Sequence, residues 1–292
     1  MINDGFENPW EQIRLLSDER RTMAFVELLR RHARGKRVLE VGCGTGLLSC
    51  VAAQLGAKQV IAVEAMDIVD VAQEIVRDHG LDEVVTVIQA DVADLPRGQV
   101  DLVFGELFNA NPFFEQIVET MGEASLWLTP EGILAPWNLR LWVALVENPG
   151  PSAEAQKANA IVERLCGEFD LMPGPFNEFL FPEGVMPPDE HLEPLVKPIS
   201  KPALALDLDL REAWKEELPG GVYVSTTPLI DGFAGGATVW FEAELDDGLV
   251  VSNEPGRPGH FGHLVSGWAE PLEIRAGEDQ RLRLGIDEHD DV

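Results

Sequence analysis

The sequence predicts a doubly wound α/β domain with a parallel sheet, followed by an antiparallel β domain that forms a barrel. In the first half, short apolar runs alternate with helix-length segments, which is typical of parallel strands joined by right-handed crossovers. From residue 203 onward, apolar and polar residues alternate instead, and turns such as Asp247-Gly248 separate the runs. That second pattern indicates antiparallel strands.

The first half contains the expected elements in order. Ser17 or Asp18 is the predicted N-cap of a helix that runs to about Arg34. We expect strands at 37–41, 59–63, 84–88 and 100–104, and helices at 47–55, 68–79 and 112–123. Residues 129–132 are expected to form a turn before strands within 133–146, and residues 1–17 are short and mixed.

The composition changes at residues 148–151, where prolines begin to accumulate. We expect a helix at 153–165, an irregular proline-rich arm at about 173–202, and strands at 203–210, 222–226, 237–245, 249–252, 263–268, 272–274 and 281–286. The chain therefore divides into an N-terminal helical segment (1–35), an α/β domain (36–147) and a β-barrel domain (148–292) that carries the arm.

The chain of 292 residues has a formal net charge of −29 at pH 7. This charge argues against nucleic acid or an anionic membrane as a partner. It favours a cationic substrate, and an acidic surface that only maintains solubility is the alternative. The three cysteines form no C-x-x-C pair, so we expect reduced thiols, no metal and no disulfide. Without a signal peptide or a membrane-spanning run, a cytoplasmic location is expected.

A glycine-rich loop follows the first predicted strand, and a helix begins directly after it. Gly42, Gly44 and Gly46 let the backbone turn sharply and approach a ligand, while the helix N-terminus presents free N–H groups. The next strand ends at Glu64, 22 residues after Gly42, where a carboxylate can accept both hydroxyls of a ribose. The pattern predicts a nucleoside-binding crevice at the carboxyl edge of the parallel sheet.

The spacing of the glycines distinguishes between two cofactors. The loop reads G-x-G-x-G, and Leu47 stands where a dinucleotide-binding loop has its third glycine, so a diphosphate has a poorer cradle. Glu40, just before the loop, would repel phosphate but suit an ammonium. S-adenosylmethionine (SAM) carries an ammonium, a sulfonium and a ribose but no phosphate, so SAM is the predicted cofactor. A nicotinamide cofactor, and with it an oxidoreductase, is the alternative.

Two further acids lie in the loop after the fourth predicted strand, beside the expected position of the sulfonium. Glu106 and Glu115 are nine residues apart, so only a folded-back loop brings them together. Two carboxylates that converge in a partly dry pocket require a cation between them, and a guanidinium binds carboxylates bidentately. The alternative is that Glu115 is an ordinary acid in the first turn of the next helix.

Five segments follow the order of one family's motifs. Residues 17–22 (SDERRT) match D-x-x-R-[TN], and residues 39–49 (LEVGCGTGLLS) match LDVGxGTGxLS. Glu64 ends the second strand, Glu106 and Glu115 have the spacing of a double-glutamate loop, and residues 259–261 (GHF) stand in place of a T-H-W loop. In these segments the chain resembles the protein arginine methyltransferases. The resemblance implies a Rossmann-like SAM-binding domain, a β-barrel, and methyl transfer from SAM to a guanidinium nitrogen of arginine.

The resemblance also implies roles for individual residues. Arg21 would pair with the SAM carboxylate, and Glu64 with the ribose hydroxyls. Glu106 and Glu115 would clamp and polarise the acceptor guanidinium. His260 would pair with Asp18, either to help remove a proton or to hold the two domains around the site, and a surface histidine is the alternative. The other implied cofactor contacts are Glu40, Gly42, Gly44, Gly46, Asp91 and Val92.

The chain departs from the family around the acceptor. Residues 2–6 replace a YFxxY segment, so both tyrosine hydroxyls are missing, and residues 107–110 (LFNA) replace W-M-G-Y. The acid that contacts adenine falls at Ala93, so Asp91 or Asp94 would have to accept from the adenine amine. The acceptor therefore stays open between arginine in a protein or peptide, a small cationic metabolite and another peptide side chain. A SAM-binding partner subunit without turnover is the alternative of another class.

The resemblance further implies a head-to-tail homodimer. In the family, an arm projects from the barrel onto a neighbour's cofactor domain, and residues 173–202 are the candidate arm here. An arm that folds back on its own barrel is the alternative.

Overall fold

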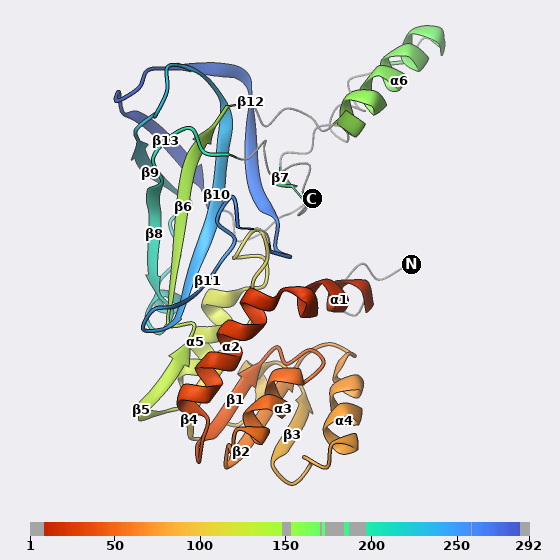
Figure 1. The fold of residues 1–292 in the computed structure, drawn as a ribbon, viewed down its shortest axis with the longest axis vertical. Coiled ribbons are helices and arrows are strands. Elements are labelled where there is room, and N and C mark those ends of the chain that lie inside the picture. Colours follow the sequence, from red (N-terminus) through yellow and green to blue (C-terminus); the bar gives the residue numbers. More distant parts are fainter. Residues whose placement is uncertain are drawn as a thin grey trace.

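The computed structural model describes residues 9–147, 153–169, 171–172, 184–186, 197–257 and 259–286. Figure 1 shows a parallel sheet with its helices at the bottom and the antiparallel strands above it. Two N-terminal helices lie at the junction between these parts. No helix of the described residues is both long and apolar enough to cross a membrane.

The lower part is a sheet of five parallel strands in the order β3-β2-β1-β4-β5, which confirms the doubly wound prediction. The strands are β1 (Arg37–Val41), β2 (Gln59–Glu64), β3 (Val85–Gln89), β4 (Val100–Gly105) and β5 (Leu128–Ala135). Because β2 and β5 lie on opposite sides of the β1–β4 pair, right-handed crossovers place their helices on opposite faces. The helices α3 (Leu47–Gln54) and α4 (Val69–Asp78) lie on one face, and α5 (Ile117–Ser125) lies on the other.

From the neighbouring parallel strands β1 and β4, successive strands are added to the sheet in opposite directions, since β2 and β3 lie beyond β1 and β5 lies beyond β4. A ligand crevice forms at such a point, outside the carboxyl ends of the strands. Val41, the last residue of β1, is paired with Gly105, the last residue of β4. The glycine loop and the loop that carries Glu106 therefore leave the sheet side by side.

The N-terminal helices are α1 (Pro9–Ser17) and α2 (Glu19–His32). Asp18 is the N-cap of α2, because its side chain accepts a hydrogen bond from the backbone N–H of Arg21 at 3.0 Å. The sequence analysis did not anticipate α1, although Pro9 is a favourable first residue for a helix. Gln12 of α1 lies over the glycine loop, since a Cβ atom at Gly44 would be 3.7 Å from Gln12 Oε1.

The upper part contains the predicted antiparallel strands. They are β6 (Asn138–Val146), β7 (Gly184–Met186), β8 (Ala203–Asp209), β9 (Gly221–Thr226), β10 (Gly232–Asp246), β11 (Leu249–Ser252), β12 (His263–Ile274) and β13 (Gln280–Gly285). In the described residues, β9 and β13 form a two-stranded sheet and the others form a six-stranded sheet. Side chains from both sheets share one apolar core, which includes Val143, Val224 and Val239. The antiparallel part begins at β6, earlier in the chain than the boundary expected at residue 148.

Several element boundaries differ from the predictions, and three of these differences coincide with an irregular backbone. The helix expected at 112–123 begins only at Ile117, because Gln116 adopts a left-handed conformation (φ +52°). The turn expected at 129–132 lies inside β5, where the pairing with β4 is irregular and jumps from Leu128 to Ile133. The strands expected at 263–268 and 272–274 form one strand, β12, whose register shifts along β10.

The segment expected to form the arm lies mostly outside the described residues. Its described residues are 184–186 and 197–202, and the first of these pieces, β7, pairs with residues 263–265 of β12 in the same chain. The preceding helix α6 (Ala153–Phe169) includes the helix expected at 153–165. Figure 1 shows α6 standing apart from both sheets.

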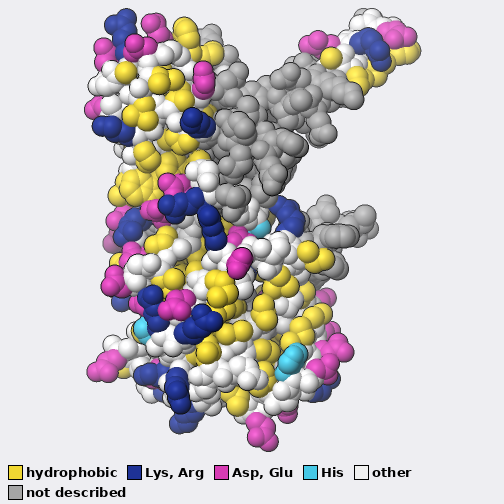
Figure 2. Space-filling view, viewed as in Figure 1, with side chains coloured by type: hydrophobic (Ala, Val, Ile, Leu, Met, Phe, Trp, Pro, Cys, Tyr) yellow, Lys and Arg dark blue, Asp and Glu magenta, His cyan; other side chains and the backbone are white. Residues whose placement is uncertain are grey.

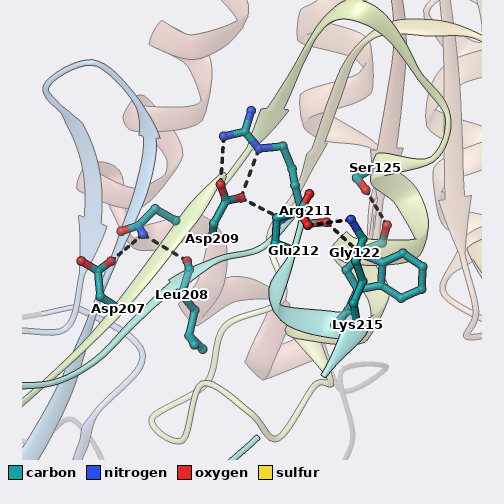
Figure 3. Close-up of polar contacts among 10 residues, drawn as sticks. Gly122, Ser125, Asp207, Leu208, Asp209, Arg211, Glu212 and Lys215 are labelled. Atoms are coloured by element: carbon teal, nitrogen blue, oxygen red, sulfur yellow. Dashed lines mark hydrogen bonds and ion pairs between the residues drawn. The ribbon is translucent and has the colours of Figure 1, made fainter. Parts of the chain in front are cut away.

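The segment after β8 connects the antiparallel part to α5, and ion pairs within the segment hold its shape. After β8, Arg211 pairs with Asp209 at 3.1 Å, and Lys215 of the 3₁₀ turn η3 (Ala213–Lys215) pairs with Glu212 at 2.7 Å, as Figure 3 shows. Trp214 lies so close to Gly122 of α5 that a Cβ atom there has no room. This packing positions α5, and with it the loop that precedes α5.

Candidate active site

The glycine loop has a backbone that only glycine adopts readily. Gly42, Gly44 and Gly46 have φ values of +68°, +51° and +73°. A Cβ atom at Gly42 would lie 2.8 Å from Cδ2 of Leu107, the residue that follows Glu106. The loop therefore packs directly against the segment that carries the acceptor-side acid.

Glu64 lies at the end of β2, as predicted, and its carboxylate closes the glycine loop. Its Oε2 accepts from the N–H of Gly44 at 2.9 Å, and its Oε1 accepts from the N–H of Met66 at 3.0 Å. Each oxygen keeps a lone pair that can accept a hydroxyl proton. The backbone thus holds the carboxylate in place before any ribose arrives.

Glu40 is buried beneath the loop, with 3% of its surface exposed, and accepts a hydrogen bond from Ser49 of α3. Burial raises the pKa of Glu40 to about 8, although Ser49 and the charge of Arg21 lower it. Its carboxyl is therefore neutral at pH 7. The expected contact with a cofactor ammonium remains a prediction.

Two of the expected cofactor contacts, Asp91 and Val92, lie after β3. Asp91 is exposed and caps the 3₁₀ turn η1 (Val92–Asp94), where it accepts from the N–H of Ala93 at 2.9 Å. Val92 is buried. The second oxygen of Asp91 has no such bond and faces solvent, which leaves it available to an amine.

Arg21 and Glu106 form an ion pair inside the protein. The Nη2 atom of Arg21 donates to Oε2 of Glu106, and the two side chains are 7% and 6% exposed. The second oxygen of Glu106 accepts from the N–H of Phe108 at 3.3 Å. Arg21 is also expected to bind the SAM carboxylate, and that contact remains a prediction.

Glu115 lies in the turn before α5, not in the helix, so its interpretation as a first-turn helix acid is wrong. Asn111 organises this turn by accepting from the N–H of Phe113 at 3.1 Å. Burial and the negative charge of Glu106 raise the pKa of Glu115 to about 9, and the charge of Arg21 lowers it. Because charge interactions weaken with distance, this dependence supports the prediction that the folded-back loop brings Glu115 toward Glu106 and Arg21.

Buried polar atoms without a partner are concentrated here. The described residues contain four such side-chain atoms, and three of them are Arg21 Nε, Thr22 Oγ1 and Glu115 Oε1. An unpaired buried polar group is costly, so these atoms indicate that a ligand completes the site. They fit a donor with a carboxylate and a cationic acceptor. Thr22 was not singled out from the sequence, although it lies in the matched segment at 17–22.

The structure also brings His260 and Asp18 together. Asp18 Oδ2 lies 3.0 Å from Nδ1 of His260 and accepts from its backbone N–H at 3.1 Å. Burial alone would raise the pKa of Asp18, but hydrogen bonds from His260 and Arg21 lower it to about 2. A Cβ atom at Gly259 would be 3.0 Å from Asp18 Oδ2, which explains why glycine stands there.

Two groups that the sequence analysis did not identify hold the loop of His260. Asn253, 2% exposed, accepts from the N–H of Phe241 at 2.8 Å and donates to the carbonyl oxygen of Gly262 at 3.0 Å. Phe108, beside Glu106, stacks on Phe241 with ring centroids 4.8 Å apart, and Phe261 packs edge-on against both. The sequence offers only the aromatic residue types as a signal for these contacts, because the residues involved are far apart along the chain.

A small cavity opens beside the Asp18–His260 couple, between α2 and β11. Its walls include Asp18, Arg20, Arg21, Arg257 and Phe261. In the space-filling view, Lys and Arg side chains gather near the middle of this face, close to a histidine (Figure 2). Three of the wall residues are arginines, and one of these, Arg257, pairs with Glu254 at 2.9 Å.

Comparisons with known proteins agree with this arrangement. A family described as Methyltransferase domain matches residues 32–173. The chain is 30% identical to an Arginine N(omega)-methyltransferase from Streptomyces achromogenes subsp. streptozoticus, over 94% of this chain and 75% of that protein. It is 28% identical to Protein arginine N-methyltransferase 1 of Schizosaccharomyces pombe, over 90% of this chain and 78% of that protein.

Solved structures show the same fold. The Trypanosoma brucei PRMT1 enzyme–prozyme heterotetrameric complex with AdoHcy contains a chain with a TM-score of 0.79 and 24% identity, over 97% of this chain and 89% of that chain. Protein Arginine Methyltransferase 10 of Arabidopsis thaliana also has a TM-score of 0.79, at 22% identity, over 96% of this chain and 88% of that chain. The chain belongs to the protein arginine N-methyltransferase family of SAM-dependent methyltransferases.

Proposed function

We propose that this protein transfers a methyl group from SAM to a guanidinium nitrogen of arginine held between Glu106 and Glu115. The observation that carries the proposal is Glu115 Oε1, a buried oxygen without a partner in the same charge cluster as Glu106. A guanidinium between the two carboxylates would satisfy this oxygen and stabilise the ionised form of Glu115.

The residues at the carboxyl edge of the sheet would hold the cofactor. The glycine loop and Glu64 fit the ribose, and Arg21, with its unpaired Nε, fits a carboxylate. SAM supplies an electrophilic methyl group there. The two glutamates orient the guanidinium so that one nitrogen faces that group, and the packed Phe108 and Phe261 exclude water from the site. Such positioning can account for most of the rate gain.

Asp18 and His260 form the positioning element of this proposal. They join the N-cap of α2 to the loop after β11 and so hold the two domains around the acceptor. The bond to Asp18 uses Nδ1, which leaves Nε2 of His260 available to the proton that the methylated nitrogen loses.

The acceptor we favour is arginine within a protein or peptide. The strongly acidic chain suits a cationic partner, and most of the named relatives are protein arginine methyltransferases. Free arginine or another small cationic metabolite is the second candidate. The observation that favours it is the relative from Streptomyces, which matches nearly the whole chain and whose name specifies arginine without mention of a protein.

Mass spectrometry of the products tests this function. The purified protein is incubated with SAM and either free L-arginine or arginine-containing peptides, and an increase of one methyl mass on the arginine is expected. Glu106→Gln and Glu115→Gln should each lower kcat/KM by about 100- to 1000-fold, the typical cost of one lost electrostatic contact to a transition state. Glu119→Gln, an exposed acid in the first turn of α5, is the matched control and should retain activity. Full activity of either site variant would contradict the assignment.

We further propose a homodimer in the cytoplasm. Supporting this, the three cysteines are free and buried, as expected in a reducing compartment, and a solved relative is described as a heterotetrameric complex. Light scattering of the purified protein measures the assembly, and the mass of one chain at micromolar concentration would contradict the dimer.

A further inference from the structure

The ion pair between Arg21 and Glu106 places a guanidinium of the chain itself on a carboxylate of the acceptor site. Under the proposed function, the acceptor is also a guanidinium. The two cations therefore compete for Glu106, and the internal one already holds Oε2. In the donor-free protein, Arg21 therefore occupies the place on Glu106 that the guanidinium of the acceptor would take.

The charges around Glu106 strengthen the competition between Arg21 and the guanidinium of the acceptor. Both partners are more than nine-tenths buried, so their attraction is weakly screened. With Glu106 neutralised by Arg21 and the neighbouring Glu115 held neutral by burial, the cluster offers little net negative charge to a cation. A cationic acceptor then has to displace Arg21 before it gains a carboxylate.

Arg21 also has a hydrogen-bond donor without a partner, which a carboxylate of the methyl donor could accept from. Its Nε atom is buried and has no partner, and Thr22 Oγ1, one residue further along α2, is buried and unpaired as well. A carboxylate at these atoms would balance the charge of Arg21. The charge of Glu106 would then be free for another cation.

We propose that Arg21 couples the two binding events of the reaction. Arg21 shields Glu106 in the donor-free protein and exposes it to the acceptor guanidinium when the arginine side chain binds the donor carboxylate. The acceptor therefore binds tightly only after the donor. This inference rests on the proposed function, because it assumes that Glu106 receives the acceptor. By reciprocity, a bound acceptor tightens the donor by the same factor.

Isothermal titration calorimetry with non-reacting ligands tests the coupling. The acceptor probe is N-acetyl-L-arginine amide, whose only charge is its guanidinium. It is titrated into protein alone, into protein saturated with S-adenosylhomocysteine, and into protein saturated with decarboxylated S-adenosylhomocysteine. These two donor analogues differ only in the carboxylate. S-adenosylhomocysteine should tighten acceptor binding by about tenfold, within the range usual for coupled sites, and the decarboxylated analogue should not.

Substitution of Arg21 should increase the affinity for the acceptor probe, whereas removal of a binding-site residue usually decreases affinity. Arg21→Gln should bind the acceptor probe more tightly than wild type when no donor is present, because Glu106 is then unshielded. The two donor analogues should have equal effects on this variant. Arg30→Gln removes an exposed arginine in the last turn of α2, away from the site, and is the matched control, which should keep the wild-type coupling. Arg21→Lys retains the charge and serves if the glutamine variant does not fold.

Equal tightening by both analogues in wild-type protein would overturn the coupling, as would a full carboxylate effect in Arg21→Gln. Acceptor binding that is undetectable in every wild-type complex would overturn it too. Product analysis separates these failures from failure of the proposed reaction. Methylation of arginine with equal affinities rejects only the coupling, whereas coupled binding without methylation rejects only the reaction.

Discussion

The donor side and the acceptor side of this site are built from carboxylates at the carboxyl ends of β2 and β4, two parallel strands on either side of β1, yet these carboxylates are satisfied to different degrees. On the donor side, both oxygens of Glu64 accept backbone N–H groups. On the acceptor side, Glu115 has a buried oxygen without a partner, and Glu106 is bound to an arginine of its own chain.

This difference teaches which half of the site depends on its ligand. Backbone amides cannot leave a carboxylate, so the donor side keeps its shape with or without a nucleoside. The acceptor side instead carries an unfavourable charge arrangement that a bound cation relieves. This arrangement lowers the free energy of unfolding through the side chains of Arg21, Glu106 and Glu115. Substitution of these residues should therefore change the stability of the donor-free protein.

The largest expected effect is a contrast in stability between Glu115→Gln and Glu106→Gln. The folded-state pKa of Glu115, about 9, lies above its unfolded value near 4.5. Folded protein therefore binds more protons than unfolded protein between these pH values, and the stability of wild type falls as pH rises through this window, by up to ~1.4 kcal/mol per pH unit. Glu115→Gln lacks this loss, so its advantage over wild type should grow from pH 5 to pH 9.

Glu106→Gln should behave in the opposite way, because it leaves the buried Arg21 without its counter-charge. We expect a loss of about 3 kcal/mol, the usual cost of breaking a buried pair on one side. Denaturant unfolding of donor-free protein at pH 5, 7 and 9 measures both effects. A difference between Glu115→Gln and wild type that is independent of pH would contradict the charge arrangement on the acceptor side.

The next effect concerns the loop that closes the acceptor side. Asn253→Ala leaves the buried N–H of Phe241 and the carbonyl oxygen of Gly262 unpaired, which should cost about 2 kcal/mol in unfolding free energy. Because this loop carries His260, kcat should fall while donor affinity stays near wild type. Asn253→Asp keeps the acceptor for Phe241 but loses the donor, so it separates the two bonds. Unchanged stability of the alanine variant would show that the loop is held by its aromatic contacts alone.

The smallest effect is expected on the preformed donor side. Gly42→Ala introduces a side chain at φ +68° and a contact with Leu107, which should weaken binding of S-adenosylhomocysteine by about tenfold, or ~1.4 kcal/mol. Gly35→Ala is the matched control, because Gly35 has φ +73° but nothing within 4 Å of the added Cβ atom. Equal losses of affinity in both variants would mean that strain far from the loop, not the loop itself, controls donor binding.

Local patterns were sufficient for much of the fold. The strands around the glycine loop fall within one residue of their predicted bounds, and Asp18 caps α2 as one of the two predicted candidates. The helix α1 was missed because nine residues at a chain end have a weak periodic signal. The start of α5 was misplaced because Gln116 adopts a left-handed conformation, which is uncommon for residues other than glycine and could not be predicted from a glutamine.

The sequence by itself determined the succession of strands and helices along the chain, the glycine loop and the acids that end β2 and follow β4, because apolar periodicity and glycine spacing act over a few residues. Only the tertiary structure decided that Arg21 pairs with Glu106, that Asn253 holds the loop of His260, and that Glu115 lacks a partner. These contacts join residues far apart in the chain, so they depend on how the sheets pack against α2 and α5. The chemistry of the site is set by that packing.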